Sequence, residues 1–348
     1  MKKRLIARIF LCVVMTAFLV GCADSALQEE SSMENSTGEI ETIFHDSENA
    51  VEEIVLPVTE MEVSDKSATV SYVGEVFTKS VFATGGTMLY VCGIKEDGNY
   101  FLGRMLKEED IFQEFDVGMG EGLRALNMAV DKQDRCHILW MSVEKYELNG
   151  QLFDHITYEK SYITVVDREG KLEKEIDVSG IFASRQKRPF CFAADEEGNY
   201  YFESERELIQ ILPDGTEGRS VACGGWIEGI GTGKSGIIYC TTYNEESGER
   251  KLVRLEEDGI SICDAQLPES DATYAGIYAG TDSELLIFNK KNGIFAVDDN
   301  GAEVRVSGTE LPITGERIVG YGILSDGRAC IMAQEDGATT FYYIPSGK

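Results

Sequence analysis

The feature that most constrains this chain is a unit of four short apolar runs that recurs along most of its length. In the clearest copy, residues 190–223, three runs rich in Ile, Leu, Tyr and Phe and a more polar fourth run are separated by turns such as Asp214-Gly215. Short runs of β-forming residues joined by Asp-Gly or Asn-Gly turns predict antiparallel strands. Four such strands in about 35 residues are typical of one blade of a β-propeller.

The same order of runs and turns recurs in five more segments, namely 80–117, 126–178, 227–265, 274–306 and 318–344. The last segment has only three runs, whereas the run at 69–77 has no hairpin partner of its own. Pairing 69–77 with 339–344 supplies the missing strand and closes the ring, which removes exposed sheet edges. We therefore predict an all-β propeller of six four-stranded blades over residues 67–348, with no amphipathic helix. Two stacked β-sandwiches are the alternative.

The first 22 residues have the pattern of an export signal. Four basic residues within the first eight precede a twelve-residue apolar stretch, 9–20, which is too short to span a bilayer as a helix. The stretch ends in Leu19-Val20-Gly21-Cys22, which resembles the lipobox of bacterial lipoproteins. The resemblance implies that residues 1–21 are removed and that the Cys22 thiol is diacylated. The protein would then be anchored by lipid to the cell membrane and face the extracytoplasmic side. An ordinary signal peptide with a chance cysteine is the alternative.

The segment that follows the signal, 22–66, has the composition of a linker. Residues 23–65 hold thirteen Asp or Glu and no Lys or Arg. Such a segment repels itself and buries little apolar surface, so we expect a disordered, acidic tether for the propeller. In the alternative, residues 50–63 pack on the domain.

The body is similar to the β-propeller repeats of bacterial extracytoplasmic proteins. It also resembles the propeller-like segment that precedes the solute-binding domain in some Gram-positive transporter lipoproteins. The resemblance covers residues 67–348 and rests on the spacing of runs and turns. It implies a role beside transporter components in solute capture, although the sequence ends after the repeats without a solute-binding domain of its own.

Charge and composition exclude several kinds of partner. The formal net charge of −29 argues against a nucleic-acid binder, because phosphate contacts need clustered Lys and Arg. Three His and no spaced Cys/His cluster argue against a zinc site, and we expect no metal and no cofactor. The body has seven cysteines and no CxxC pair, and most lie in apolar runs, so we expect small buried thiols.

Catalysis is the less favoured interpretation. An enzymatic propeller needs His, Asp or Glu side chains at its centre as bases or metal ligands. The body holds only His137, in an apolar run that suits a structural role, and His155. The Asp residues of the turns have a local backbone role. We name no catalytic residue, and an extracytoplasmic hydrolase or lyase acting on carbohydrate or small esters stays the alternative.

A recognition face is the more specific expectation. In a propeller, the connections from each outermost strand to the next innermost strand share one face, and the insertion at 145–159 rises from the same side. Basic and aromatic residues that converge there in an acidic protein are typical of a binding site. The candidate residues are Arg124, Arg185, Lys187, Arg188, Trp226, Arg317, Tyr146 and His155.

These patterns together predict a membrane-anchored, non-catalytic binding module. Its ligand would be a protein or a carbohydrate. A purely structural envelope protein is the third possibility. If Arg185 and Arg188 belong to one solvated loop and Trp226 is part of the core, the face has no role in recognition.

Overall fold

The computed structural model describes two long stretches of the chain, 122–149 and 151–263. It also describes shorter pieces on either side of them: 55–57, 59–63, 68–73, 78–85, 88–94, 100–106, 111–115, 267, 276–280, 283–289, 293–298, 304–307, 318–323, 329–335 and 338–344. The predicted signal segment, Cys22 and Arg317 lie outside the described residues.

The described strands form six antiparallel sheets, which are the six predicted blades. In blades 1 to 5 the chain runs outward from the inner strand through four consecutive strands. Blades 1 to 3 contain β4 (Thr78–Gly85), β5 (Met88–Ile94), β6 (Tyr100–Leu106) and β7 (Ile111–Phe115); β8 (Leu123–Val130), β9 (Cys136–Leu148), β10 (Gln151–Val166) and β11 (Leu172–Asp177); and β12 (Phe192–Ala194), β13 (Tyr200–Ser204), β14 (Glu207–Ile211) and β15 (Glu217–Ala222).

Blades 4 and 5 have the same order, and blade 6 takes its outer strands from the N-terminal part of the chain. They contain β16 (Trp226–Thr232), β17 (Ile238–Tyr243), β18 (Arg250–Glu256) and β19 (Gly259–Ile262); β20 (Gly276–Ala279), β21 (Leu285–Asn289), β22 (Gly293–Val297) and β23 (Val304–Ser307); and β24 (Ile318–Ile323), β25 (Ala329–Glu335), β26 (Ala338–Ile344), β3 (Ala68–Val73) and β2 (Thr59–Val63).

The inner strands contact one another in a closed cycle. Strand β4 contacts β8, and contacts then follow in turn through β12, β16, β20 and β24 back to β4. The strands converge so closely that a side chain at Gly231 would collide with Ile277 of the next blade, and one at Gly320 would collide with Phe82. Glycine at these positions lets neighbouring inner strands approach.

The buried apolar residues that the structure describes form six clusters, one at each junction between blades. The division follows from the alternation of side chains along each strand. On β13, Tyr200 and Phe202 belong to the cluster shared with blade 2, whereas Tyr201 between them belongs to the cluster shared with blade 4. The predicted buried thiols lie in these clusters, and all seven cysteines of the body are buried.

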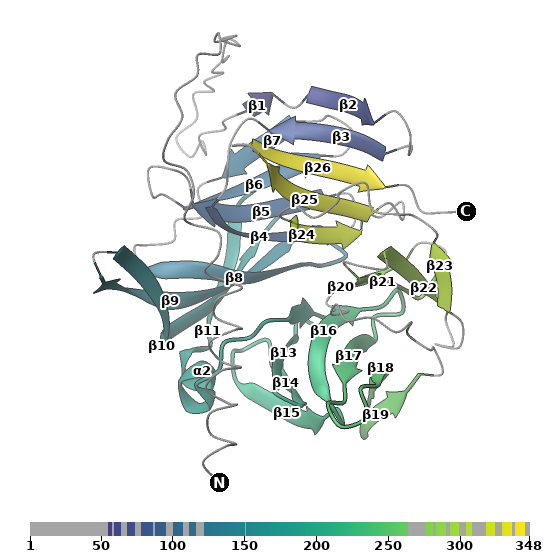
Figure 1. Ribbon diagram of the computed structural model, residues 1–348. Coiled ribbons are helices and arrows are strands. Elements are labelled where there is room, and N and C mark those ends of the chain that lie inside the picture. The colour runs from purple at the N-terminus through teal and green to yellow at the C-terminus, as the bar shows by residue number, and fades with distance from the viewer. Residues whose placement is uncertain are drawn as a thin grey trace. The chain divides into compact units, whose positions relative to one another are not determined.

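The predicted ring closure is confirmed. Strand β3 pairs antiparallel with β26, from Thr69 opposite Tyr343 to Val73 opposite Thr339. Figure 1 shows the purple β3 beside the yellow β26, although the two lie at opposite ends of the sequence. The lone strand expected at 69–77 does have a hairpin partner, because β2 pairs with β3 from Thr59 opposite Tyr72 to Val63 opposite Ala68.

Two described strands lie within the segment 22–66. Strand β2 is the outer edge of blade 6, and β1 (Val55–Pro57) pairs with β7 as a fifth strand of blade 1. These strands follow the alternative in which 50–63 packs on the domain. Their acidic residues hid the strand pattern, because Glu60 and Glu62 alternate with apolar residues on an edge strand.

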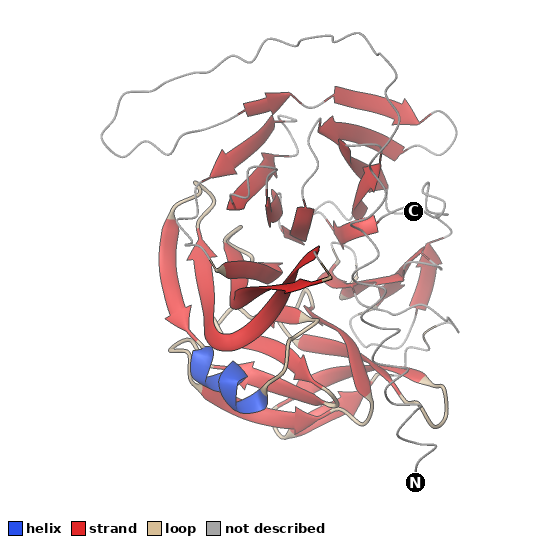
Figure 2. Ribbon diagram, turned by 60° about the vertical axis from the view of Figure 1, so that its left-hand side comes forward, coloured by secondary structure: helices blue, strands red, loops and turns tan. Residues whose placement is uncertain are grey.

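Among the described residues, the structure adds one short helix, α2 (Ser179–Arg185), that the sequence pattern does not reveal. It follows β11 and appears in blue in Figure 2. Its buried residues Ile181 and Phe182 join the core between blades 2 and 3, where the rings of Phe182 and Phe202 lie 4.8 Å apart. Seven residues with no side-chain N-cap give too little periodicity to mark a helix. No helix among the described residues is long and apolar enough to cross a membrane.

Candidate functional site

The strand order gives the propeller two faces with different connections. Because successive strands of a blade are antiparallel, the hairpins from first to second strand and from third to fourth strand share one side, which we call the turn face. The other side, which we call the connection face, carries the hairpins from second to third strand. It also carries the connections from each outer strand to the next inner strand.

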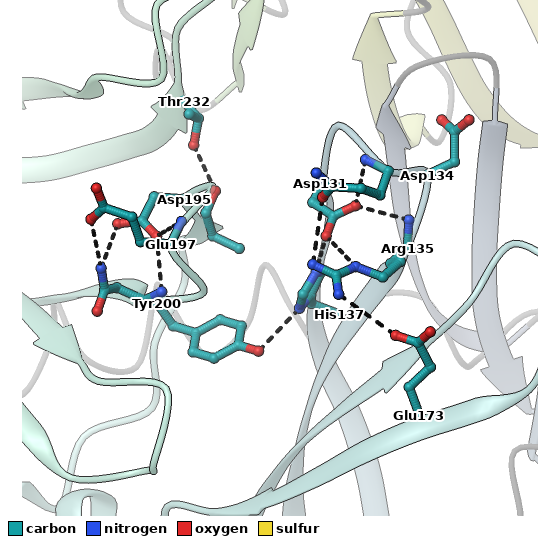
Figure 3. A network of polar contacts seen from close by, with 12 residues as sticks. Asp131, Asp134, Arg135, His137, Glu173, Asp195, Glu197, Tyr200 and Thr232 are labelled. Atoms are coloured by element: carbon teal, nitrogen blue, oxygen red, sulfur yellow. Dashed lines mark hydrogen bonds and ion pairs between the residues drawn. The ribbon is translucent and has the colours of Figure 1, made fainter.

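On the turn face, Asp131 organises the first hairpin of blade 2 (Figure 3). One carboxylate oxygen accepts backbone hydrogen bonds from Gln133 (2.9 Å) and Arg135 (3.0 Å). The other accepts from Arg135 Nε (2.7 Å) and His137 Nε2 (3.0 Å). Burial alone would raise the pKa of Asp131, but the hydrogen bonds from His137 and Arg135 outweigh it and lower the pKa to about 2.

His137 is a buried structural residue of this network. Its Nε2 contacts Asp131, and its Nδ1 lies 3.1 Å from the hydroxyl of Tyr200 in blade 3 (Figure 3). A carboxylate accepts, so Nε2 carries the proton and Nδ1 accepts from Tyr200. Since both nitrogens are occupied and the side chain is 3% exposed, His137 has no free lone pair to offer a substrate.

The first hairpin of blade 3 is also held by an aspartate carboxylate. Asp195 accepts backbone hydrogen bonds from Glu197 (3.0 Å) and Asn199 (2.9 Å), and its second oxygen accepts from Asn199 Nδ2 and from the hydroxyl of Tyr201. Both turn aspartates therefore have the local backbone role that the sequence suggested.

Blade 4 has Gly233 where blades 2 and 3 have the turn aspartate. The carboxylate comes instead from Glu284 of blade 5, which accepts from the backbone and hydroxyl of Ser235. A side chain at Gly233 would collide with this carboxylate. The buried Glu284 thus links two blades.

A cavity of about 500 Å³ lies at the centre of the propeller and touches all six inner strands. Its carboxylates come from Asp131, Asp195 and Glu196, and the described lining includes no histidine. The two aspartates hold their turns, and Glu196 forms an ion pair with Lys132. Among the described residues, no three His, Cys, Asp or Glu side chains gather in a way that would hold a metal ion.

Two of the predicted basic residues are neutralised by carboxylates of blade 3. Arg185, at the end of α2, donates from Nε to Glu217 (3.2 Å) and lies 3.7 Å from Glu207. Lys187 forms an ion pair of 2.6 Å with Glu205. These pairs fix the segment after α2 against the outer strands, so the charges of Arg185 and Lys187 are already satisfied.

Arg124 and Arg188 differ from the paired residues. Their Nε atoms are buried and, among the residues that the structure describes, neither has a hydrogen-bond partner. Burial and the positive charge of Arg124 lower the pKa of Arg188. A buried donor without an acceptor costs about 1–3 kcal/mol, so each Nε would gain from an added acceptor, although the two side chains are only half-buried.

Glu203 fixes the backbone beside Arg188. Its carboxylate accepts hydrogen bonds from the amides of Phe190 and Cys191, the latter at 2.8 Å. Burial raises the pKa of Glu203 to about 7, although both amides and the charge of Arg188 act in the opposite direction. The Phe190 side chain is 67% exposed, lines the central cavity and lies under the Arg188 guanidinium, with 5.9 Å from Cζ to the ring centroid.

A bulge in β10 brings Tyr158 close to Arg188. The pairing of β10 with β9 is regular from Gln151 to Ile156 and resumes at Ser161, which leaves 157–160 opposite Ser142. The Ser142 hydroxyl lies 2.5 Å from the hydroxyl of Thr157 and accepts from the amide of Lys160 (3.2 Å), which closes the bulge. Tyr158 packs on the core between blades 2 and 3 and is close enough to influence the pKa of Arg188.

Trp226 opens the inner strand of blade 4 and is 36% exposed. Arg206, in the hairpin between β13 and β14, lies over its ring, with 5.5 Å from Cζ to the centroid. The same hairpin carries Glu205, whose side chain contacts Lys187 and whose carbonyl accepts from the amide of Ile227 (3.2 Å). This hairpin therefore connects Trp226 to the segment that bears Arg188.

Tyr146 and His155 form a separate aromatic cluster on the extended β9–β10 hairpin. The ring of Tyr146 stacks on that of its cross-strand partner Phe153 at 5.5 Å and meets His155 edge-on at 6.5 Å. Tyr146 is 47% exposed. The hairpin thus presents an aromatic surface of its own, away from the core.

Sequence reasoning did not single out Phe190, Glu203 or Asn127. Phe190 belongs to the apolar run 190–194, and Asn127 is one polar residue within the run 126–130. Glu203 left a usable signal, since a carboxylate that continues the apolar run 200–202 must find a partner or stay protonated.

No protein-family model matches the chain, and no curated protein sequence matches it. Among solved structures, a gluconolactonase from Xanthomonas campestris is similar to it at 13% identity over 83% of this chain and 95% of the other, with a TM-score of 0.49. The soluble aldose sugar dehydrogenase of Escherichia coli is 10% identical over 80% and 99%, with a TM-score of 0.47. The Pan2 WD40 domain of Neurospora crassa is 12% identical over 78% and 90%, with a TM-score of 0.45.

Proposed function

We propose that the chain is a lipid-anchored, extracytoplasmic β-propeller that binds a protein or carbohydrate ligand on its connection face and catalyses no reaction. One observation carries the binding part of the proposal: exposed aromatic rings lie against guanidinium groups there, Phe190 with Arg188 and Trp226 with Arg206. Aromatic and arginine side chains of this kind dominate the energetics of binding surfaces.

The central cavity supports binding over catalysis. A hydrolase or lyase would need converging carboxylates and a base with free hydrogen-bonding capacity. The cavity carboxylates Asp131 and Asp195 are committed to turns, and both nitrogens of His137 have partners. Chemistry at this centre would have to break the contacts that hold the inner hairpins.

The location and the partner are further parts of the proposal. The Leu19–Cys22 motif supports a lipid anchor on the outer side of the cell membrane. The resemblance of the repeats to transporter lipoproteins supports a role beside transporter components in solute capture.

The binding proposal is tested by screening the full-length protein, purified in detergent, on a glycan array and against immobilised extracytoplasmic proteins. The affinity for a hit is then compared for the wild type, Trp226→Ala and Ile262→Ala. Ile262 is a matched control, since it is 60% exposed and lies on the outer strand of the same blade. We expect Trp226→Ala to lose about 2 kcal/mol of binding free energy and Ile262→Ala to bind like the wild type. A sharp drop in melting temperature with unchanged affinity would show that Trp226 is a core residue and would overturn the proposal.

A further inference from the structure

Arg124 and Arg188 are brought together by the backbone of two neighbouring blades. Arg124 is the second residue of β8, and Arg188 stands four residues before β12. The inner strands β8 and β12 contact each other, and Asn127 Nδ2 of β8 donates a hydrogen bond of 3.0 Å to the carbonyl oxygen of Pro189. Both arginines are therefore held within a few residues of one fixed contact.

Among the described residues, Arg124 and Arg188 lack the ion pairs that neighbouring basic residues form. Arg185, Lys187 and Arg250 all have carboxylate partners, and Arg250 binds Glu228 through both Nε (2.8 Å) and Nη2 (3.0 Å). The buried Nε atoms of Arg124 and Arg188 have no partner among the described residues. The nearby Glu203 carboxylate already accepts from two backbone amides.

We propose that Arg124 and Arg188 together bind one oxyanion group of the ligand, a carboxylate or a phosphate, while the apolar part of the ligand lies on Phe190. This inference rests on the proposed function, since it names the chemical class that the connection face recognises.

The chemistry of the site fits such a group. A guanidinium presents Nε and Nη donors in a planar fork that matches the oxygens of a carboxylate or phosphate, and two forks supply more donors than one oxyanion needs. An oxyanion would satisfy both buried Nε atoms and remove the repulsion between the two cations. The exposed ring of Phe190 offers an apolar surface beside it, and the phenol of Tyr158 lies close by.

The strong negative charge of the protein makes the pair distinctive. A net charge of −29 repels anions at long range, but this repulsion is screened over about 10 Å at 0.1 M salt. Two arginines whose buried Nε atoms have no partner among the described residues can therefore bind an anion that the rest of the surface rejects.

The test is isothermal titration of the full-length protein in detergent with inorganic phosphate, acetate and benzoate, with ionic strength held constant by sodium chloride. We expect saturable binding of phosphate or of the carboxylates, and at least about tenfold weaker binding for Arg124→Gln and Arg188→Gln. Arg168→Gln should bind like the wild type, because it makes the same change of charge at an exposed residue of the turn face. Arg188→Lys, which keeps the charge but loses the fork, should give an intermediate affinity and guards against misfolding of the glutamine variants.

Comparing the affinities for phosphate and for the carboxylates distinguishes the possible kinds of ligand. Tighter binding of phosphate indicates a phosphorylated ligand, and tighter binding of carboxylates indicates an acidic sugar or a peptide carboxyl group. Benzoate should bind more tightly than acetate, and Phe190→Ala should remove that difference. Absence of saturable binding, or equal affinities for wild type, Arg124→Gln and Arg188→Gln, would overturn the inference. The binding function would still stand if a ligand from the array binds in a manner that depends on Trp226.

Discussion

The side-chain amide of Asn127, on the inner strand of blade 2, donates a hydrogen bond of 3.0 Å to the carbonyl oxygen of Pro189, just before the inner strand of blade 3. This contact joins two blades beside the unpaired arginines. It holds the segments of Arg124 and Arg188, which are 64 positions apart in the sequence, close enough for the charge of Arg124 to lower the pKa of Arg188.

Asn127→Ala tests this link. The variant removes a partly buried hydrogen bond, so we expect a loss of about 1 kcal/mol in the free energy of unfolding, measured by urea denaturation. Because the Pro189 segment is released, phosphate or carboxylate binding should weaken as well. Unchanged stability together with unchanged anion binding would show that the Pro189 segment is positioned by other contacts, such as the Glu203 carboxylate.

The lowered pKa of Asp131 predicts that the protein loses stability in acid. Its pKa is lowered from 3.8 to about 2 in the folded protein, so its stabilising contribution is fully present above the unfolded pKa and is lost as the pH falls from about 4 to 2. The size of this contribution is about 2 kcal/mol. Asp131→Asn should therefore lower the free energy of unfolding at pH 7 by about 2 kcal/mol, with the difference from the wild type shrinking toward pH 2.

Asp167→Asn is the control for that measurement. Asp167 holds its hairpin through the amides of Glu169 (2.9 Å) and Lys171 (2.8 Å), on the same face of blade 2. It lies in an exposed turn, so its substitution should cost less than about 1 kcal/mol. Equal costs for the two variants would mean that His137 and Arg135 add nothing to the role of Asp131.

The sequence was sufficient for the blades because their signals are local. Alternating apolar residues and Asp-Gly turns set each strand of 190–223, and the incomplete last copy pointed to β3 as the closing strand. Strands β1 and β2 were hidden because the acidic composition of 22–66 dominates their short patterns. Helix α2 was hidden because it depends on burying Ile181 and Phe182 in a core that only the fold creates.

The sequence predicted which connections carry the candidate residues, but it did not predict which of these residues form ion pairs. The repeat placed Arg124, Arg185 and Arg188 in connections between blades. Which of them stays unpaired depends on the register of blade 3, which sets Glu217 and Glu207 beside Arg185. Spacing along the chain does not reveal this pairing, because the two members of each salt bridge lie on different elements of the fold.

Truncations test the closure of the ring. Deleting 23–53 leaves every described strand in place, so the melting temperature should stay close to that of the full chain. Deleting 23–66 removes the edge strands β1 and β2 and should cost a moderate amount of stability. Deleting 23–75 also removes β3, leaves β26 as an open edge and should cost more than about 4 kcal/mol. Equal melting temperatures for the last two truncations would contradict the role of β3 in closure.

Cys22→Ala tests the lipid anchor. The Leu19–Cys22 motif predicts acylation of the Cys22 thiol, and two acyl chains anchor a protein stably to a membrane. The variant should leave the membrane fraction for the medium or accumulate unprocessed, as followed by cell fractionation and immunoblotting. A variant that fractionates and migrates like the wild type would show that the chain is not a lipoprotein.

The central claim, that Arg124 and Arg188 are held unpaired for a ligand, is tested most directly by urea denaturation of Arg188→Met and Arg250→Met without added anion. Methionine keeps most of the aliphatic stem and removes the charge. Arg250 pairs with Glu228, and their side chains are only 14% and 9% exposed, so its loss should cost about 3 kcal/mol. Arg188→Met should leave the free energy of unfolding unchanged or raise it, because it removes a half-buried cation whose Nε has no partner among the described residues and whose pKa is lowered by burial and by Arg124. A loss for Arg188→Met as large as that for Arg250→Met would contradict the account, since Arg188 would then be paired within the protein itself.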